Sequence, residues 1–300
     1  INLYDHLRAI INKNKERGIN MKKIINTFVL VVFTYVSSIL PAYSAQCTND
    51  TWNKVMKRGK LVVGAKADYK PWGFKDSSGK IIGMEADMAQ AVADIMGVDL
   101  ELVAVQSSNR MQFLEQGKID LMIATMSDRK DRRKIVGIIQ PNYYTSGTNV
   151  MSPKALGLKT WEDLRGKPVC GKQGAFYNKI VAERYGAKIV AFTGNAEAKQ
   201  ALRDKKCIAW VYDDSSIMSD LSSGNFNDFE MPFNSEDDNP WGLAVPLGEV
   251  NCVFGNFMSG LSFMMHQNGT LMELEKKWGI QATAYLKAKN KEYSDWLAGK

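Results

Sequence analysis

Four cysteines are the side chains whose chemistry follows most directly from residue type and spacing. No two of them stand in a Cys-x-x-Cys pair, and the chain has only two histidines, so a zinc site is not expected. If the chain is exported, an even number of cysteines predicts disulfides, with three pairings open. The cysteines are Cys47, Cys170, Cys207 and Cys252, and the histidines are His6 and His266.

Charged side chains are the second chemically informative set. The chain has 39 Lys and Arg against 32 Asp and Glu, a formal charge of +7, but residues 1–45 contribute +4 of it and leave +3 for residues 46–300. The densest basic run, residues 129–134, is interleaved with Asp128 and Asp131. This pattern favours a solvated helix face over a phosphate-binding patch. No nucleic-acid partner is expected, because such proteins usually carry a dense basic stripe.

Residues 21–45 are predicted to be a signal peptide. Met21 precedes two lysines and an apolar stretch, and Ala42 and Ser44 supply the small residues that a signal peptidase reads, so cleavage is expected near Ser44–Ala45. Residues 1–20 are interpreted as a leader that is not translated. Polar residues within the stretch disfavour an uncleaved membrane anchor, and Gln46 disfavours lipid attachment at the following cysteine.

The rest of the chain alternates short apolar strands with amphipathic helices. In the helix predicted at 85–96, Met88, Val92 and Ile95 are expected to face inward, and Gly97 ends the helix. Further helices are predicted at 46–60, around 111–116, and at 176–185, 196–205 and 215–221, with mainly helical structure from 250 onward. Strands are predicted at 61–65, 100–105, 119–124, 168–171, 188–191, 208–212 and 242–245.

This alternation predicts an α/β fold with two lobes. Residues 46–149 together with 243–300 are expected to form lobe one, and residues 150–242 lobe two. Short extended crossings near Thr148–Met151 and Asn239–Leu243 would join them. A ligand would lie between the lobes, near the strand ends.

Several segments, in this order and spacing, resemble the polar amino-acid-binding proteins of ABC importers, family 3 of the extracellular solute-binding proteins. The resemblance runs from about Trp52 to Trp278 and implies a type II periplasmic-binding-protein (Venus flytrap) fold. It also implies a periplasmic monomer without cofactor that works with the membrane subunits of an ABC importer. The segments are Asp-Tyr-Lys-Pro-Trp-Gly-Phe at 68–74, Gly-Met-Glu-Ala-Asp-Met at 83–88, Gly-Lys-Ile-Asp-Leu at 117–121 with Ala-Thr-Met-Ser at 124–127, Trp-Glu-Asp-Leu-Arg-Gly-Lys-Pro-Val at 161–169, and Pro-Trp-Gly-Leu-Ala at 240–244.

By the same resemblance, Arg132 is expected to hold the carboxylate of a free amino acid, because its guanidinium offers a bidentate fork. Ser127 and the backbone near Thr125 would add donors. Asp213, which follows a predicted strand, would hold the ammonium from the opposing lobe. From pattern alone the alternatives are a surface helix arginine and a helix N-cap.

Arg110 resembles the arginine that reaches the ligand side chain in family members preferring acidic amino acids. Lys66 would add a second cation, so an acidic or amide ligand is expected. The alternative is an exposed arginine at a helix start. Tyr69 and Trp72 are expected to wall the pocket, with lobe-one core as their alternative.

The sequence departs from the family pattern at Gly174, Ala175 and Phe176, where family members usually carry Gly-Thr-Thr. Phe176 is expected to narrow the pocket or to stack on a larger substrate. This departure keeps open a binder of another small solute, such as an osmolyte or organic acid.

Some relatives join cysteines at the positions of Cys170 and Cys207, which implies that pairing here and a Cys47–Cys252 bridge within lobe one. Two further functions are disfavoured by the sequence. A few relatives dehydrate small cyclic acids, but no histidine and no paired carboxylates stand near the cleft segments, so no enzyme is expected. A receptor's sensory lobe is disfavoured because no transmembrane segment or signalling domain follows.

Overall fold

The computed structural model describes Cys47 and residues 50–299. The predicted signal peptide with its cleavage site, and the predicted leader, lie outside these residues. Residues 50–299 belong to one compact unit. Within the described part of the chain, no helix combines the length and the apolar character needed to cross a membrane.

The first sheet has five strands in the order β5-β1-β6-β14-β7. The second strand of this order, β1, pairs in parallel with β5 and β6 and is an apolar run buried on both faces, which fits a parallel sheet covered on two sides. The strands are β1 (Lys60–Lys66), β5 (Asp99–Val105), β6 (Leu121–Met122), β7 (Val136–Ile138) and β14 (Ala244–Pro246); the helices around it are α3 (Asp50–Arg58), α4 (Met84–Met96), α5 (Arg110–Glu115), α9 (Val253–Gln267), α10 (Thr270–Lys277) and α11 (Ala284–Leu297). A small sheet of β2 (Asp68–Tyr69), β3 (Gly73–Lys75) and β4 (Ile81–Ile82) adjoins β1.

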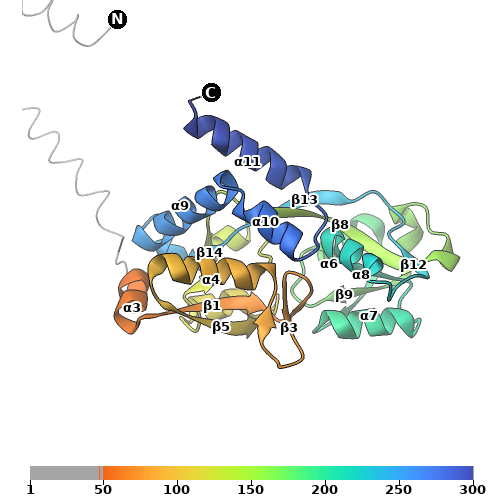
Figure 1. The fold of residues 1–300 in the computed structure, drawn as a ribbon. Coiled ribbons are helices and arrows are strands. Elements are labelled where there is room, and N and C mark those ends of the chain that lie inside the picture. Colours follow the sequence, from red (N-terminus) through yellow and green to blue (C-terminus); the bar gives the residue numbers. More distant parts are fainter. Residues whose placement is uncertain (1–46, 48–49, 300) are drawn as a thin grey trace, which may run out of the picture. The chain divides into compact units, whose positions relative to one another are not determined.

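The second sheet follows the order β10-β9-β11-β8-β12, and β13 also pairs with β8. Strands β9, β10 and β11 are parallel, whereas β8 is antiparallel to β11. Figure 1 shows α4 over β1 and β5, and α6, α7 and α8 around the second sheet. The elements are β8 (Tyr144–Pro153), β9 (Pro168–Lys172), α6 (Tyr177–Tyr185), β10 (Lys188–Phe192), α7 (Asn195–Arg203), β11 (Ala209–Asp213), α8 (Asp214–Ser222), β12 (Phe229–Glu230) and β13 (Glu236–Trp241).

We call the parts built on the first and second sheets lobe one and lobe two. The chain passes between the sheets within residues 139–143 and 242–243, where β7 gives way to β8 and β13 to β14. The first passage therefore lies before the segment Thr148–Met151 in which it was expected. Strands β8 and β13 pair beside these passages, with Tyr144 opposite Trp241, so both crossings are held together by backbone hydrogen bonds.

Helix α4 shows how local sequence sets the buried face. Gly97 ends it in the left-handed conformation, with φ of 68°, as the glycine predicted. Met88 and Val92 are buried, but Ile95 is 49% exposed, so the prediction for Ile95 was wrong. The inward position in the last turn is taken by Met96, four residues after Val92, which leaves Ile95 at the outer edge of the stripe.

A predicted disulfide is present in lobe two. Cys170 and Cys207 are bonded, with their Cα atoms 5.6 Å apart, which confirms this pairing and ties β9 to the segment before β11. Cys47 and Cys252 each take part in a disulfide, and their pairing with one another stays a prediction. No cysteine among the described residues is free.

Candidate ligand-binding cleft

The candidate site is a small cavity where the two lobes meet, near the carboxyl end of β11. Its volume is about 10 Å³, which is roughly the space of one water molecule. The lobes are therefore closed against each other, and a free amino acid could enter only after they separate. Lobe one contributes Ser107, Arg110, Thr125, Ser127 and Arg132, and lobe two contributes Ala175, Phe176, Tyr177, Tyr212 and Asp213.

Arg132 begins a short 3-10 helix (Arg132–Lys134) and is only 6% exposed. Its Nη1 donates to the backbone oxygen of Ser127 at 3.3 Å. Burial lowers its pKa, and the nearby Arg110 and Arg129 lower it further. A buried guanidinium with other cations beside it favours the binding of an anionic group next to it. Arg132 is therefore not the surface arginine of the alternative prediction.

Arg110 begins α5 and is 3% exposed, so it is also no surface residue. Its Nη1 donates to the backbone oxygens of Ala124 and Thr125, the latter at 2.9 Å. Thr125 has a φ of 48°, which is unusual for a threonine, and its N–H donates to Glu85 Oε1 at 2.6 Å. The strained loop is therefore held from both sides, by a buried arginine and a buried carboxylate.

Asp213 ends β11 and occupies the N-cap position of α8, but its side chain makes no capping hydrogen bond. Instead its Oδ2 accepts a hydrogen bond from the hydroxyl of Tyr69, in the other lobe, at 2.8 Å. Burial raises the pKa of Asp213 to about 7; the bond from Tyr69 opposes this rise, whereas Asp214 adds to it. A bound ammonium would stabilise the ionised carboxylate.

Positive charge exceeds negative charge around the cavity. Lys66 is fully buried, contacts Ser107 through its Nζ, and has a pKa lowered by burial first and then by Lys172 and Arg110. Burial raises the pKa of the neighbouring Glu85, which weakens the negative charge that this carboxyl can supply.

Phe176 lies against cations of the opposite lobe. Its ring centre is 4.5 Å from the guanidinium carbon of Arg129 and 5.7 Å from that of Arg132. These distances suit cation–π contact. Phe176 thus lines the cavity and also joins the lobes, a role that the sequence did not indicate.

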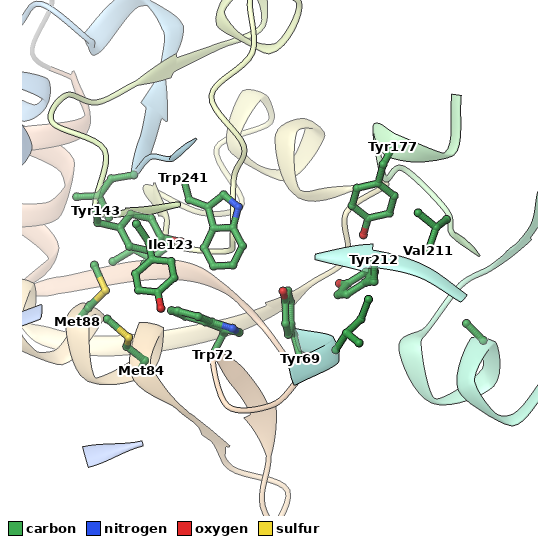
Figure 2. Packing of buried hydrophobic residues seen from close by; sticks show 14 of the residues in the cluster. Tyr69, Trp72, Met84, Met88, Ile123, Tyr143, Tyr177, Val211, Tyr212 and Trp241 are labelled. Carbon is green, nitrogen blue, oxygen red and sulfur yellow. The ribbon is translucent and has the colours of Figure 1, made fainter. Parts of the chain in front are cut away.

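Three predicted residues do not line the cavity. Trp72 is buried in the aromatic core of Figure 2, 4.3 Å from Tyr144 and 4.9 Å from Trp241 between ring centres, as the core alternative described. Tyr69 reaches the site only through its hydroxyl, and its ring lies 5.0 Å from that of Tyr212. Gly174 adjoins the site at a close approach between the lobes.

Sequence reasoning did not name Tyr177, Tyr212 and Ser107 as lining residues. Each lies within three residues of a predicted binding residue. That proximity along the sequence was the signal that could have identified them. Glu85 was also missed as a support of the loop, although it lies in the segment 83–88 that carries the family resemblance.

Comparison with known proteins agrees with this architecture. A model of the family described as bacterial extracellular solute-binding proteins, family 3, matches residues 61–281. The ABC transporter glutamine-binding protein GlnH of Bacillus subtilis (strain 168) is 28% identical over 273 residues, which cover 86% of this chain and 97% of GlnH.

Two solved structures are similar in fold. A mutant of ArgBP from T. maritima matches with a TM-score of 0.71 and 26% identity, covering 76% of this chain and 98% of that one. The ancestral amino-acid-binding protein AncCDT-1, a precursor of cyclohexadienyl dehydratase, matches with a TM-score of 0.66 and 30% identity, covering 76% and 99%. These likenesses confirm the type II periplasmic-binding-protein fold. The chain belongs to the bacterial extracellular solute-binding proteins, family 3.

Proposed function

We propose that this protein is the solute-binding component of an amino-acid ABC importer and that it captures a free amino acid between its lobes. The observation that carries this proposal is the pair of buried opposite charges on the cavity wall. Arg132 comes from lobe one and Asp213 from lobe two. A zwitterion needs these two partners a few ångströms apart.

Each group has a defined role in this proposal. Arg132 receives the α-carboxylate, because a guanidinium binds both oxygens of a carboxylate in one plane. The backbone at Thr125 and the hydroxyl of Ser127 provide further donors beside it. Asp213 receives the ammonium, and the bond from Tyr69 orients its carboxylate toward the cleft.

Binding then proceeds by hinge closure, the established behaviour of periplasmic binding proteins as a class. The solute first meets the lobe-one donors in the open form. When lobe two approaches, Asp213, Phe176 and Tyr212 complete the enclosure and displace water. The solute therefore shifts the population toward the closed form, which membrane subunits of an importer would recognise.

The charge balance supports an acidic or amide ligand. Lys66 and Arg110 are buried cations near the cavity, with Glu85 as a carboxyl close to both; a side-chain carboxylate of the ligand would add the negative charge that a neutral zwitterion lacks. Relatives differ in their ligands: GlnH is named for glutamine, and ArgBP has been solved with arginine. A cationic side chain is disfavoured here by the same buried cations.

A dehydratase-like activity is the alternative that one observation favours. AncCDT-1 is a precursor of such an enzyme, and Asp213 has the pKa near 7 that suits a general acid. Incubation with a panel of small cyclic acids tests it. Product formation that is lost in Asp213→Asn would establish catalysis, and unchanged substrates leave binding as the function.

The proposed function is tested by thermal unfolding of the exported, ligand-stripped protein with each of the twenty amino acids and with small organic acids. A ligand that binds only the folded state raises the melting temperature. We expect shifts with glutamate, aspartate or their amides. The shifts should disappear in Arg132→Ala and persist in Arg133→Ala, a neighbouring arginine whose side chain is 42% exposed. Shifts only with compounds lacking an α-amino group would remove the role given to Asp213.

A further inference from the structure

A second set of charged contacts joins the lobes outside the cavity. Lys172 ends β9 in lobe two, and its Nζ lies 2.6 Å from Oδ2 of Asp68, in β2 of lobe one. The same oxygen accepts the backbone N–H of Asn195 at 3.2 Å, and the Asn195 side chain donates to the Asp68 backbone oxygen at 3.3 Å. None of these three residues lines the cavity.

We propose that Asp68, Lys172 and Asn195 form an interlobe latch that brings the lobes together without solute and so sets the affinity of the binding site. These are positioning residues: they act on the solute only by favouring the closed form. The proposal rests on the proposed function only where it concerns the affinity for the solute.

Burial gives the latch its strength. The side chain of Lys172 is fully buried in the closed form, whereas that of Asp68 keeps 20% of its surface exposed. Burial lowers the pKa of Lys172, and Asp68 opposes this by raising it. Without Asp68, closure would bury an uncompensated ammonium, and breaking such a pair is far more destabilising than removing both partners.

The amino-terminal end of α7 adds to the attraction. Asn195 is the first residue of this nine-residue helix, and its N-cap, Gly194, has no side chain to accept the free N–H groups. The carboxylate of Asp68 takes one of these positions from the opposite lobe, where the helix dipole also favours a negative charge. Asp68 of lobe one thus accepts a hydrogen bond from the amino-terminal end of α7 in lobe two only when the lobes are closed.

The latch and the ligand site are built on shared segments. Asp68 precedes Tyr69, whose hydroxyl contacts Asp213. Lys172 lies two residues before Gly174, where the two lobes approach closely. One closing movement therefore forms both sets of contacts. Because all donors and acceptors of the latch belong to the protein, its formation needs no solute.

The test compares the radius of gyration of the ligand-free protein by small-angle X-ray scattering, in wild type, Asp68→Asn, Lys172→Met and the double variant. We expect the ligand-free wild type to populate the closed form in part, Asp68→Asn to have a larger mean radius, and the double variant to recover most of the wild-type radius. The matched control is Asp220→Asn, which removes an ion pair with Lys199 that lies wholly within lobe two, at 2.8 Å. It should not change the radius.

L-glutamate serves as the binding probe in the same variants. Asp68→Asn should raise its dissociation rate roughly tenfold or more, with the association rate little changed. Equal radii for ligand-free wild type and Asp68→Asn, whether both open or both closed, would overturn the latch even if glutamate binds. An opened Asp68→Asn with no amino acid bound by the wild type would keep the latch and remove the proposed function.

Discussion

Gly174→Ala places a methyl group at a close contact between the two lobes. Gly174 has a φ of +75°, and a Cβ there would lie 2.6 Å from the backbone N of Ser108 and 2.7 Å from its Cα, both in lobe one. Ordinary contact begins at 3.4 Å, so the shortfall is about 0.8 Å, and it is met by backbone that cannot rotate away. Full closure should therefore be blocked.

The magnitude follows from the contacts that closure forms. A separation of about 0.8 Å would lengthen the 2.8 Å bond from Tyr69 to Asp213 to about 3.6 Å, which is no longer a hydrogen bond. A hydrogen bond to a charged group contributes about 1.5–3 kcal/mol, and each 1.4 kcal/mol is about tenfold in affinity. We expect the ligand to bind roughly 10- to 100-fold more weakly.

Gly166→Ala is the matched control, since Gly166 has a φ of +70° in the same lobe and open space where its Cβ would lie. Both variants should lose about 1 kcal/mol of stability from the left-handed backbone, measured by urea unfolding. Only Gly174→Ala should lose affinity in isothermal titration with L-glutamate. Equal affinities for the two variants would refute the reasoning that the lobes close at Gly174.

Further predictions concern stability, pH and specificity. Replacing Cys170 and Cys207 by serine should lower the unfolding free energy by about 4 kcal/mol for a sequence separation of 37 residues, and a loss below 1 kcal/mol in urea unfolding would contradict this. Burial raises the folded-state pKa of Asp213 to about 7, above that of the unfolded chain. The folded state therefore holds the proton more tightly, and the stabilisation that this gives is present in acid and lost as the pH rises from about 4 to 7. The stability difference between ligand-free wild type and Asp213→Asn should fall over that window, and a flat difference would argue against the burial. Phe176→Ala should weaken L-glutamate binding roughly two- to tenfold through lost cation–π contact, with Phe176→Tyr near wild type; equal losses in both would point to steric fit instead. Arg110→Ala should reduce the affinity for glutamate more than that for a neutral amino acid, and equal reductions in titration would remove Arg110 from specificity.

Local patterns predicted most of the elements because they depend on neighbouring residues. The run at 61–65 became β1, the helix at 176–185 became α6, and Gly97 ended α4. The Cys170–Cys207 pairing came from the family resemblance, since spacing alone left three pairings open. Ile95 shows the limit: periodicity assigns a face but does not say which edge of that face the sheet covers.

The candidate site was predicted in part. Six of the nine named binding residues line one cavity, namely Arg110, Thr125, Ser127, Arg132, Phe176 and Asp213. Trp72 instead packs in the aromatic core. The burial of a loop side chain depends on which distant segment lies beside it, and the local sequence does not specify that segment. Here that segment is the crossing strand that carries Trp241.

By itself the sequence determined the order of strands and helices, the two α/β sets and the places where polar residues follow strand ends. These properties are local, since each depends on the spacing of apolar residues and on the glycines between them. The tertiary structure alone decided that Asp213 faces Tyr69, that Phe176 lies on arginines of the other lobe and that Asp68 meets Lys172. Those contacts join residues about 45 to 145 positions apart, and a buried charge finds its partner only when the lobes close.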